Sequence, residues 1–545
     1  MTNMSRTQIL IIAGLAVFLC PAAVRTVGGT EGHSESTVCL RLQAATVRIS
    51  SGADRSSGVV ISSQGHVLTV AHGLHGDTDN VTIIFQDGTA TVAAILLKDS
   101  EADVAVLKID LGENRVLSPI PVSADADPVK NAIVFAAGYP GRERNGLLPV
   151  VRLGELLAVE PHALRSSCTL TSGDSGGPLV NERGELIGLH RKIGVGRESN
   201  LHLPLDCLWT AIMPVLDVSA IGKSSLPAAA TNAAPLSITP PVPVEVACRR
   251  RTVELRYDAW HEVPVILGTL LSESLVATKL SELSPNLPVQ CRLDSGAACF
   301  ASIIRSDTAL DIAILKLADE QPKMPALIFP ERIPDAGSSH YRFQFVFAAN
   351  NGVRVSRAGI ASRDAYAEPG LPCRFGAILK ASKQAKAVIV TEVTPNGSAA
   401  SAGLVDGSVI RSLDGSSVSS LEDVDRILSR RQPGDWLSIE SFWNPDRHSA
   451  TVRLQHDPGE QFERAEFLDG RSGRVSERRS GFKGVLQHDI PISPEECGGP
   501  LFDASGRIIA INIARRARES TLAVPIADVL RLANQIHDSV DANDD

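Results

Sequence analysis

The sequence contains one series of apolar segments twice, in the same order. The repeated pairs are Asp99–Lys108 with Asp307–Lys316, Phe135–Ala137 with Phe347–Ala349, Ser175–Leu179 with Cys497–Leu501, and Gly184–Leu189 with Gly506–Ile511. Such repetition indicates that two units of the same fold follow one another in the chain. The 545 residues also exceed what one hydrophobic core usually serves, so we expect three or four domains.

The first unit has the pattern of an all-β barrel protein. From about Cys39 to Leu216, short segments rich in Val, Ile and Leu alternate with turn signals such as Gln64-Gly65. Many short strands with regular turns are typical of barrels. We expect a helix at 204–212 to close the unit, and the Ala- and Pro-rich stretch 222–245 to be a semi-stiff linker.

Three segments of the first unit carry residue types that suit nucleophilic catalysis. His72 ends the string Thr-Val-Ala-His, Asp103 precedes an apolar strand-like run, and Ser175 lies in Gly-Asp-Ser-Gly-Gly-Pro, which begins at Gly173. A serine hydroxyl needs an imidazole to take its proton and a carboxylate to orient that imidazole. We therefore predict Ser175 as the nucleophile, His72 as the general base and acid, and Asp103 as the orienting carboxylate. The glycines let the N–H groups of Gly173 and Ser175 turn toward a developing oxyanion.

These strings, in the order His, Asp, Ser, resemble the trypsin-like serine proteases of the HtrA/Deg type. The resemblance implies a mainly β fold with a chymotrypsin-like double β-barrel over residues 36–221. It also implies that Leu189 and His190 shape the specificity pocket and that Thr169 lies near its base. No acidic residue stands there, so we expect a small or medium apolar side chain, rather than Lys or Arg, before the cleaved bond.

The second copy is expected to be a degenerate domain of the same double-barrel kind, in two parts, 246–368 and 457–536. Ala277–Leu280 stands where the first copy has Thr-Val-Ala-His, and Cys497 replaces the serine. Asp311 keeps the carboxylate but has no histidine to orient. A thiolate enzyme is the alternative, with Lys279 as the cation that would lower the pKa of the thiol. We favour an inactive barrel, because Lys279 is not a positioned acid for a leaving amine.

An insert of a different kind separates the two parts of the second copy. It contains a β-branched run at 388–393 and an expected helix at 421–430, and it resembles a PDZ domain over residues 373–456. The string Arg374-Phe375-Gly376-Ala377 resembles the loop whose backbone amides hold the terminal carboxylate of a peptide. The resemblance implies recognition of C-terminal peptides by strand addition. A PDZ domain kept only for interdomain packing is the alternative.

The N-terminus has the pattern of a targeting segment. Arg6 precedes an apolar run from Ile9 to Leu19, which is shorter than the ~20 residues that span a membrane. We expect a cleaved signal peptide over residues 1–23 and a periplasmic or secreted protein. An uncleaved anchor, which would leave the protein at the membrane, is the alternative. A lipid attachment at Cys20 is disfavoured by the bulky residues before it.

Export would permit disulfides, although the cysteine spacing fits neither a small disulfide scaffold nor a metal site. Cys291 and Cys299 flank a predicted hairpin turn and are one candidate pair. Cys168 and Cys207 are another.

Polar residues after the catalytic histidine, His75, Asp77 and Asp79, are expected to form a solvated loop, and neither a metal nor another cofactor is predicted. The net charge of −9 gives no electrostatic case for binding nucleic acid. Two short basic runs, Arg249–Arg251 and Arg474–Arg479, are expected to be solvent-exposed.

Together these observations predict an exported serine endopeptidase that cleaves unfolded or damaged proteins through an acyl-enzyme. Its partners would be polypeptide substrates and C-terminal peptides, and the family resemblance is compatible with a homo-oligomer. The alternative is a non-enzymatic scaffold or holdase of the cell envelope that only binds peptides.

Overall fold

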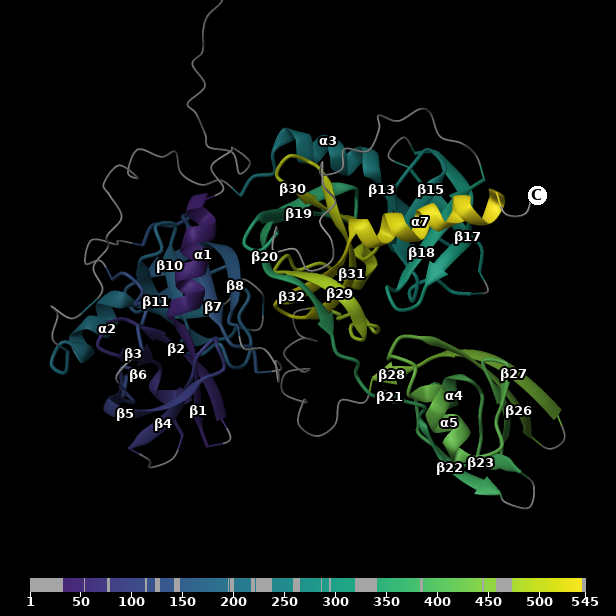
Figure 1. Cartoon of the computed structure of the whole chain (residues 1–545), viewed down its shortest axis with the longest axis horizontal. Coiled ribbons are helices and arrows are strands. Elements are labelled where there is room, and N and C mark those ends of the chain that lie inside the picture. Colours follow the sequence, from purple (N-terminus) through teal and green to yellow (C-terminus); the bar gives the residue numbers. More distant parts are fainter. Residues whose placement is uncertain are drawn as a thin grey trace, which may run out of the picture.

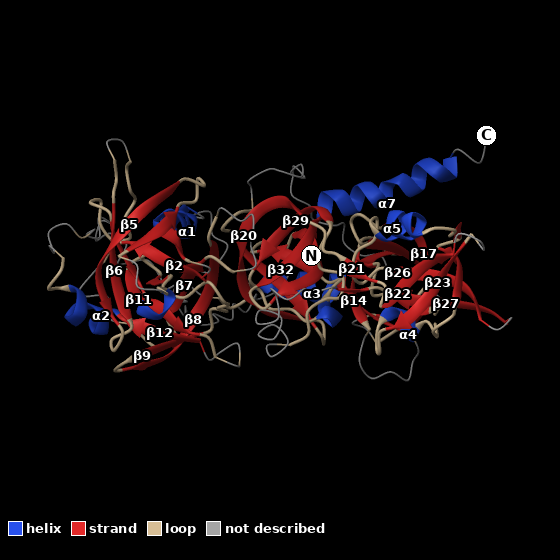
Figure 2. Cartoon of the chain, turned by 90° about the horizontal axis from the view of Figure 1, so that it is seen from below, coloured by secondary structure: helices blue, strands red, loops and turns tan. Residues whose placement is uncertain are grey.

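The computed structural model describes most of the chain beyond its N-terminus. The described residues are 33–52, 54–75, 79–112, 115–122, 128–141, 148–194, 196, 200–216, 221, 238–257, 265–285, 287–293, 296–318, 341–382, 386–443, 446–456 and 473–541. The predicted signal peptide and residues 222–237 of the predicted linker lie outside them. Strands dominate the described part, as Figure 2 shows, so the prediction of a mainly β fold is confirmed.

The first unit consists of two closed six-stranded barrels. The strands of the first barrel are ordered β1-β2-β3-β6-β5-β4, with bounds β1 Thr46–Ser51, β2 Asp54–Val60, β3 His66–Thr69, β4 Asn80–Ile84, β5 Ala90–Asp99 and β6 Val104–Ile109. The second is ordered β10-β11-β12-β9-β8-β7, with bounds β7 Ile133–Gly138, β8 Val150–Glu160, β9 Ala163–Ser166, β10 Pro178–Asn181, β11 Leu186–Lys192 and β12 Asn200–Pro204. Closure removes free strand edges.

The second unit repeats this plan. Its barrels are ordered β13-β14-β15-β18-β17-β16 and β19-β20-β29-β32-β31-β30. The strand bounds are β13 Thr252–Arg256, β14 Ile266–Leu270, β15 Leu275–Lys279, β16 Val289–Arg292, β17 Ala298–Asp307, β18 Ile312–Leu317, β19 Phe345–Asn350, β20 Arg354–Glu368, β29 Phe482–His488, β30 Pro500–Asp503, β31 Ile508–Ala517 and β32 Ser520–Pro525. The same strand order confirms the prediction of two double-barrel domains.

Helices close the barrels. The predicted helix near 204–212 is α2, Leu205–Ile212, which packs on β6, β11 and β12. Helix α1, His33–Ala45, packs on β1, β7 and β8, and α7, Ile526–Asp541, packs on β17, β18, β31 and β32. No helix within the described ranges is long and apolar enough to cross a membrane.

The two basic runs are exposed as predicted at Arg249, Arg250 and Arg474, but not along their whole length. Residues 242–251 form helix α3, Val242–Arg251, so the predicted linker ends earlier than 245. Val244 and Cys248 lie one helical turn apart and are fully buried against the second unit. The Pro-rich composition predicts an exposed linker here, but the end of this stretch belongs to the folded unit. Arg251 is also buried, as are Arg478 and Arg479 of the second run.

The insert between β20 and β29 is a separate small domain with its own core. It contains β21 Cys373–Arg374, β22 Ala377–Ser382, β23 Ala387–Val393, α4 Ser398–Ser401, β24 Val409–Leu413, β25 Ser416–Ser417, α5 Leu421–Leu428, β26 Trp436–Trp443, β27 Asp446–Arg453 and β28 Gln455–His456. Its main sheet is ordered β22-β23-β24-β26-β27. Strand β22 is therefore an edge strand of this sheet in the described chain, and α5 packs beside it.

The two double-barrel units pack directly on each other. Strands β8 and β20 face one another across the boundary, as Figure 1 shows, and buried apolar residues of both units form one continuous cluster. Asp489 joins the two strands, because its carboxylate accepts hydrogen bonds from the backbone N–H of Leu153 at 2.6 Å and of Ile360 at 2.7 Å. This contact matters for the site described below.

No disulfide joins any two of the eight cysteines in the described chain. Cys291 and Cys299 lie directly opposite each other on β16 and β17, as the hairpin prediction requires, but they are not bonded. Cys168 is buried near the carbonyl of Val134, whereas the thiol of Cys207 contacts the carbonyl of Pro161. The predicted alternative pair therefore does not form.

Candidate active site

The first barrel brings His72 and Asp103 together. His72 lies in the short 3-10 helix Ala71–Gly73 that follows β3, and Asp103 immediately precedes β6, which pairs with β3. The Nδ1 atom of His72 is 3.0 Å from both carboxylate oxygens of Asp103, and the backbone N–H of His72 donates to Asp103 Oδ1 at 3.1 Å. Asp103 adopts the left-handed φ of 56°, which turns its carboxylate back toward the histidine.

A third residue, Arg191, also holds the Asp103 carboxylate. Arg191 lies near the end of β11 in the second barrel, and its Nε donates a hydrogen bond to Asp103 Oδ2 at 3.1 Å. Burial raises the pKa of Asp103, but the hydrogen bonds from His72 and Arg191 outweigh it and keep that pKa below its usual value. No motif in the sequence indicated this arginine, because it lies far from the histidine and the aspartate in the chain.

This geometry fixes which nitrogen of the histidine can act as a base. An ionised carboxylate only accepts hydrogen bonds, so Nδ1 of a neutral His72 carries the proton and Nε2 presents a lone pair. Nε2 has no hydrogen-bond partner among the described residues, and nearly half of the His72 side chain is exposed. The ring is therefore oriented as a general base requires.

The loop that carries Ser175 is attached to the first barrel through Ser57 of β2. The hydroxyl of Ser57 donates to the carbonyl of Gly173 at 2.8 Å and accepts from the N–H of Tyr139 at 2.9 Å. The N–H of Ser57 donates to the carbonyl of Ser175 at 2.8 Å. A β-carbon on Gly176 would lie 2.2 Å from Oγ1 of Thr69, the last residue of β3. The serine loop therefore packs tightly against the strand that leads to His72.

Asp174, between Gly173 and Ser175, is fully buried in an ion pair. Its carboxylate lies 2.9 Å from Nη1 of Arg152 on β8, and it accepts from the N–H of Thr171 at 2.7 Å. Both side chains of the ion pair are about 1% exposed. Burial raises the pKa of Asp174 to about 6, against the opposing charge of Arg152. The pair fixes the turn at the nucleophile, and no motif in the sequence indicated Arg152.

The backbone of this turn leaves two hydrogen-bond donors free. Gly173 has a φ of 97°, and a β-carbon there would meet the carbonyl of Tyr139 at 2.4 Å, so only glycine fits. The N–H groups of Gly173 and Ser175 donate to no acceptor in the described chain. Two unsatisfied N–H groups beside a serine hydroxyl are the arrangement that stabilises an oxyanion.

The structure buries the three residues predicted to shape the substrate pocket. Leu189 packs in the main core, and Thr169 is 2% exposed with an Oγ1 atom that has no hydrogen-bond partner among the described residues. His190 Nδ1 lies 2.9 Å from Nδ1 of His202, and its Nε2 lies 3.2 Å from the carbonyl of Ala137. His190 is thus engaged by the protein itself, while its part in a pocket stays a prediction.

The second unit places Ser281, not Leu280, at the position of His72. Thr278 pairs with Ala313 on β18 as Thr69 pairs with Ala105 on β6, so the predicted alignment of Ala277–Leu280 with Thr69–His72 was wrong by one residue. The N–H of Ser281 donates to Asp311 Oδ1 at 2.8 Å, and its hydroxyl donates to Oδ2 at 2.9 Å. A serine hydroxyl therefore replaces the imidazole base.

Lys279 is buried in an ion pair with Asp311 instead of activating the thiol. Its Nζ donates to Asp311 Oδ2 at 2.7 Å and to the carbonyl of Arg478 at 2.9 Å, and both charged side chains are essentially inaccessible. Asp311 thus has a partner, although not a histidine.

Cys497 is fully buried, and its thiol contacts Ser476 and the carbonyl of Ser493. Its Sγ lies 3.6 Å from Oγ of Ser476, and Ser476 pairs with Arg515 of β31 through its N–H, which donates to the Arg515 carbonyl at 2.9 Å. Burial raises the pKa of Cys497 to about 12, although the charge of Lys279 opposes the shift. These contacts leave the thiol neutral and covered.

In the insert, the predicted carboxylate-binding loop joins β21 to the edge strand β22. Phe375 is buried and its carbonyl accepts from the N–H of Ala399, while Gly376 has a φ of 78° and accepts from Thr394. Ala377 begins β22. Arg374 ends β21.

The polar loop after His72 shows a local ion pair. His75 Nδ1 lies 3.6 Å from Asp54 Oδ2, and both side chains are more than half exposed. Asp79 is also exposed, and Asp77 lies outside the described residues.

Comparison with known proteins agrees with this arrangement. Residues 56–189, which carry all three predicted catalytic residues, match the trypsin-like peptidase domain family, and residues 389–435 match the PDZ domain family. The chain thus combines a trypsin-like peptidase domain with a PDZ domain. The predicted resemblance to HtrA/Deg serine proteases, and with it a serine-type endopeptidase domain, is confirmed.

Several named relatives are similar to part of this chain. It is 32% identical over 162 residues to Protease Do-like 1, chloroplastic, of Arabidopsis thaliana, covering 28% of this chain and 36% of that protein. It is 32% identical over 139 residues to the serine endoprotease DegS of Escherichia coli K12, covering 25% and 38%. It is 30% identical over 170 residues to a probable periplasmic serine endoprotease DegP-like of Halomonas elongata, covering 30% and 32%. The chain thus spans about a third of the length of these relatives.

A solved structure, a serine endoprotease from Yersinia pestis, aligns at 15% identity over 77% of this chain and 98% of that chain. Its TM-score of 0.30 is too low for the arrangement of the domains to be compared.

Proposed function

We propose that the chain is a serine endopeptidase that cleaves polypeptides through an acyl-enzyme on Ser175. His72 would take the proton of the Ser175 hydroxyl as it attacks the peptide carbonyl, and would then return it to the leaving amine. Asp103 would stabilise the resulting imidazolium, and the N–H groups of Gly173 and Ser175 would bind the oxyanion. Water would then release the acyl group by the same steps.

The observation that carries this proposal is the orientation of His72 by Asp103. The contacts on Nδ1 leave Nε2 as the only ring nitrogen able to accept a proton, and the Ser175 loop packs against the strand that delivers this ring. A histidine with only a structural role would need no such free, half-exposed nitrogen.

The experiment that tests the proposal is cleavage of casein by the purified chain and its Ser175→Ala variant. We expect the wild-type chain to degrade casein and the variant to be inactive while unfolding at the same temperature. Casein cleavage that persists in the variant at the wild-type rate would contradict the assignment.

We further propose that the PDZ domain binds C-terminal peptides, which would add a strand to β22 opposite α5. The free edge of β22 and the left-handed Gly376 at its start support this. The test is titration of the Ser175→Ala chain with a fluorescent peptide and with the same peptide carrying a C-terminal amide. We expect the free acid alone to bind, and equal affinity for both peptides would contradict recognition of the carboxylate.

For the second unit we propose a supporting role without peptidase activity. Three observations support this role. Ser281 lies at the base position, Cys497 is neutral and buried, and Ser476 of the segment 473–480 lies against its thiol. Because Ser476 already pairs with β31, an external peptide would first have to displace an internal segment. A Cys497→Ala variant that lost casein cleavage while still folding would contradict this role.

Export through a cleaved signal peptide, and a role in removing unfolded proteins in the periplasm, complete the proposal. The basic residue and apolar run at the N-terminus support it. Expression in bacteria followed by N-terminal sequencing of the periplasmic fraction tests it. We expect a mature chain that begins close to residue 24, and a full-length chain in the membrane fraction would favour the uncleaved anchor.

A further inference from the structure

The turn between β31 and β32 of the second unit is inserted into the first unit beside its active site. Arg518 in this turn is 1% exposed. Its Nη1 donates to the carbonyl of Gly194 at 2.9 Å, and its Nη2 donates to the carbonyl of Gly196 at 2.9 Å and to Oδ1 of Asn200 at 3.3 Å. One side chain of the second unit thus binds two carbonyls in the connection between β11 and β12 and the side chain of the first residue of β12.

This connection continues strand β11, which contacts both Asp103 and the loop that carries Ser175. Arg191 on β11 holds the carboxylate of Asp103. The next residue upstream, His190, exchanges backbone hydrogen bonds with both glycines after the nucleophile, because its carbonyl accepts from Gly176 at 2.8 Å and its N–H donates to Gly177 at 2.8 Å. A displacement of the end of β11 would therefore move the orienting acid and the nucleophile loop together.

A buried hydrogen-bond chain runs from Asn200 toward the same loop. Asn200 pairs with Ser166 across β12 and β9, and the Ser166 hydroxyl lies 2.7 Å from His202 Nε2. Because His190 Nε2 must donate to a carbonyl, His190 Nδ1 accepts from His202, and Ser166 donates to His202. Every hydrogen bond in this series has one donor and one acceptor when both histidines are neutral. This series of hydrogen bonds therefore couples the position of Asn200 to that of His190.

A second contact from the second unit reaches the other side of the nucleophile loop. Asp489 accepts the N–H of Leu153, the neighbour of Arg152 on β8. Arg152 in turn holds Asp174, next to Ser175. The charge of Glu519, which follows Arg518, also acts on the buried Asp174.

We propose that Arg518 of the second unit is a positioning residue for the peptidase site of the first, so that the degenerate domain acts as a built-in support for catalysis. This inference rests on the proposed function of Ser175. An isolated first unit would then carry the full motif set and still be a poor enzyme, because the end of β11 would lose the guanidinium that bridges its carbonyls. This explains why a barrel without a catalytic set of its own is retained on the same chain.

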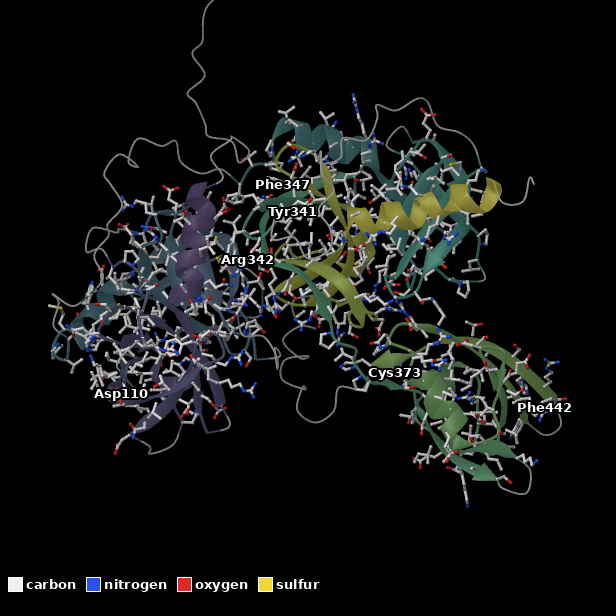
Figure 3. The ribbon with its side chains drawn as sticks, viewed as in Figure 1. Asp110, Tyr341, Arg342, Phe347, Cys373 and Phe442 are labelled. Carbon is white, nitrogen blue, oxygen red and sulfur yellow. The ribbon has the colours of Figure 1, made fainter. Side chains whose placement is uncertain are left out.

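The test compares Arg518→Ala with Arg342→Ala in the full chain. Arg342 is a matched control, because it is another arginine of the second unit that binds across the same boundary, to Oε1 of Gln43 on α1, but away from β11. Figure 3 shows it between the two units. For each variant, kcat and KM for a peptide substrate and the rate of Ser175 labelling by diisopropyl fluorophosphate are measured, together with the unfolding temperature.

We expect Arg518→Ala to lower both kcat and the labelling rate by about 10- to 100-fold, the size of effect that a small misplacement of catalytic groups causes. Arg342→Ala should retain the wild-type rates. Diisopropyl fluorophosphate is too small to fill peptide subsites, so its slower reaction distinguishes a displaced triad from a damaged pocket. Guanidinium ion at a low, non-denaturing concentration should restore part of the labelling rate of Arg518→Ala, whereas ammonium should not, because only guanidinium can bridge the two carbonyls.

Two results would overturn the inference. One is an Arg518→Ala chain that labels at the wild-type rate, whether or not its KM changes. The other is an equal loss in both variants, which would indicate general weakening of the interface. If Arg518→Ala does not fold, Arg518→Lys provides the same comparison with one carbonyl contact retained. A chain in which Ser175→Ala still cleaves peptides would instead contradict the proposed function itself, so the two failures are distinguishable.

Discussion

Asp103 and Asp311 occupy the same place in their two units and share an unusual backbone conformation, with φ of 56° and 58°. Each accepts a backbone hydrogen bond from the residue at the base position, His72 at 3.1 Å and Ser281 at 2.8 Å. The partners of the carboxylates differ. Asp103 orients an imidazole, whereas Asp311 neutralises a buried lysine. The same backbone geometry thus holds a carboxylate against an imidazole in the first unit and against a lysine ammonium in the second.

Replacing Asp103 with asparagine should abolish most of the activity without unfolding the chain. An amide can donate to Nδ1 of His72 and so favour the tautomer in which Nε2 is already protonated. We expect kcat/KM for a peptide substrate to fall by about 10⁴-fold, as removal of the orienting acid does in such triads. A variant that kept more than a tenth of the wild-type value would show that the carboxylate does not orient the base.

Ser57→Ala should slow catalysis as well as weaken the fold. The substitution leaves the carbonyl of Gly173 and the N–H of Tyr139 without their shared buried partner, which should cost about 1–3 kcal/mol of unfolding free energy. Ser62→Ala is the matched control, because Ser62 is a buried serine of the same barrel whose hydroxyl bonds to His66 and not to the serine loop. Urea unfolding and kcat are measured for both. Equal kcat in the two variants would contradict a role for Ser57 in placing Ser175.

The sequence predicted the parts of the site that lie in short contiguous strings, and it missed those made by distant residues. Ser175 and Gly173 are recognisable because a tight turn restricts the residue types that fit. Arg191, Ser57 and Arg152 carry no local signal, since an arginine or serine in a strand is ordinary until folding places it beside a carboxylate or a carbonyl. Only the pairing of strands in the folded barrels shows that these residues lie at the site.

Register also explains the misplaced alignment in the second unit. Ala277–Leu280 was matched by its similarity to Thr-Val-Ala-His, whereas the structure aligns the two copies through strand pairing with β6 and β18. The buried arginines of residues 474–479 and the helix α3 were missed for a related reason. A basic or Pro-rich stretch is usually exposed, and only tertiary contacts, such as those of Arg478 with Asp435 and with the carbonyl of Thr308, bury it.

The stability of the chain should decrease as the pH falls below 6.5. Burial lowers the pKa of His202 to about 3 and of His488 to about 4, and it lowers the pKa of His190 well below the usual value. Because these folded-state pKa values are depressed, their contribution is complete above the unfolded value of about 6.5 and is lost as the pH falls toward the folded values. Asp174, whose folded pKa is raised to about 6, acts in the opposite direction below that pH.

A His488→Gln variant isolates one of these groups. Its amide can still donate to Asn512, the partner of His488 Nε2, but it does not titrate. Between pH 6 and pH 5, the unfolding free energy of the wild type should fall by about 1 kcal/mol more than that of the variant. Urea unfolding at both pH values checks this, and parallel pH dependence in the two proteins would show that His488 is not buried neutral.

Cys497 should be unreactive until residues 473–480 are released. The half-buried Cys207 and Cys373 should react with a disulfide reagent in the native chain, whereas Cys497 should react only on unfolding. Arg478→Ala removes contacts that hold this segment, including the one to Asp435 in the PDZ domain, and should expose the thiol. Arg474→Ala, at an exposed position of the same segment, is the control. Fast native reaction of Cys497 in the wild type would contradict the covered site.

The most direct test of the account is the site at which a fluorophosphonate probe reacts with the native chain. A serine hydroxyl reacts with such a probe only when a neighbouring base activates it. We predict a single adduct, which peptide mass spectrometry places on Ser175 and which is lost in His72→Ala. A folded chain that forms no adduct on Ser175, or forms it equally well without His72, would contradict the claim that these residues make a working peptidase site.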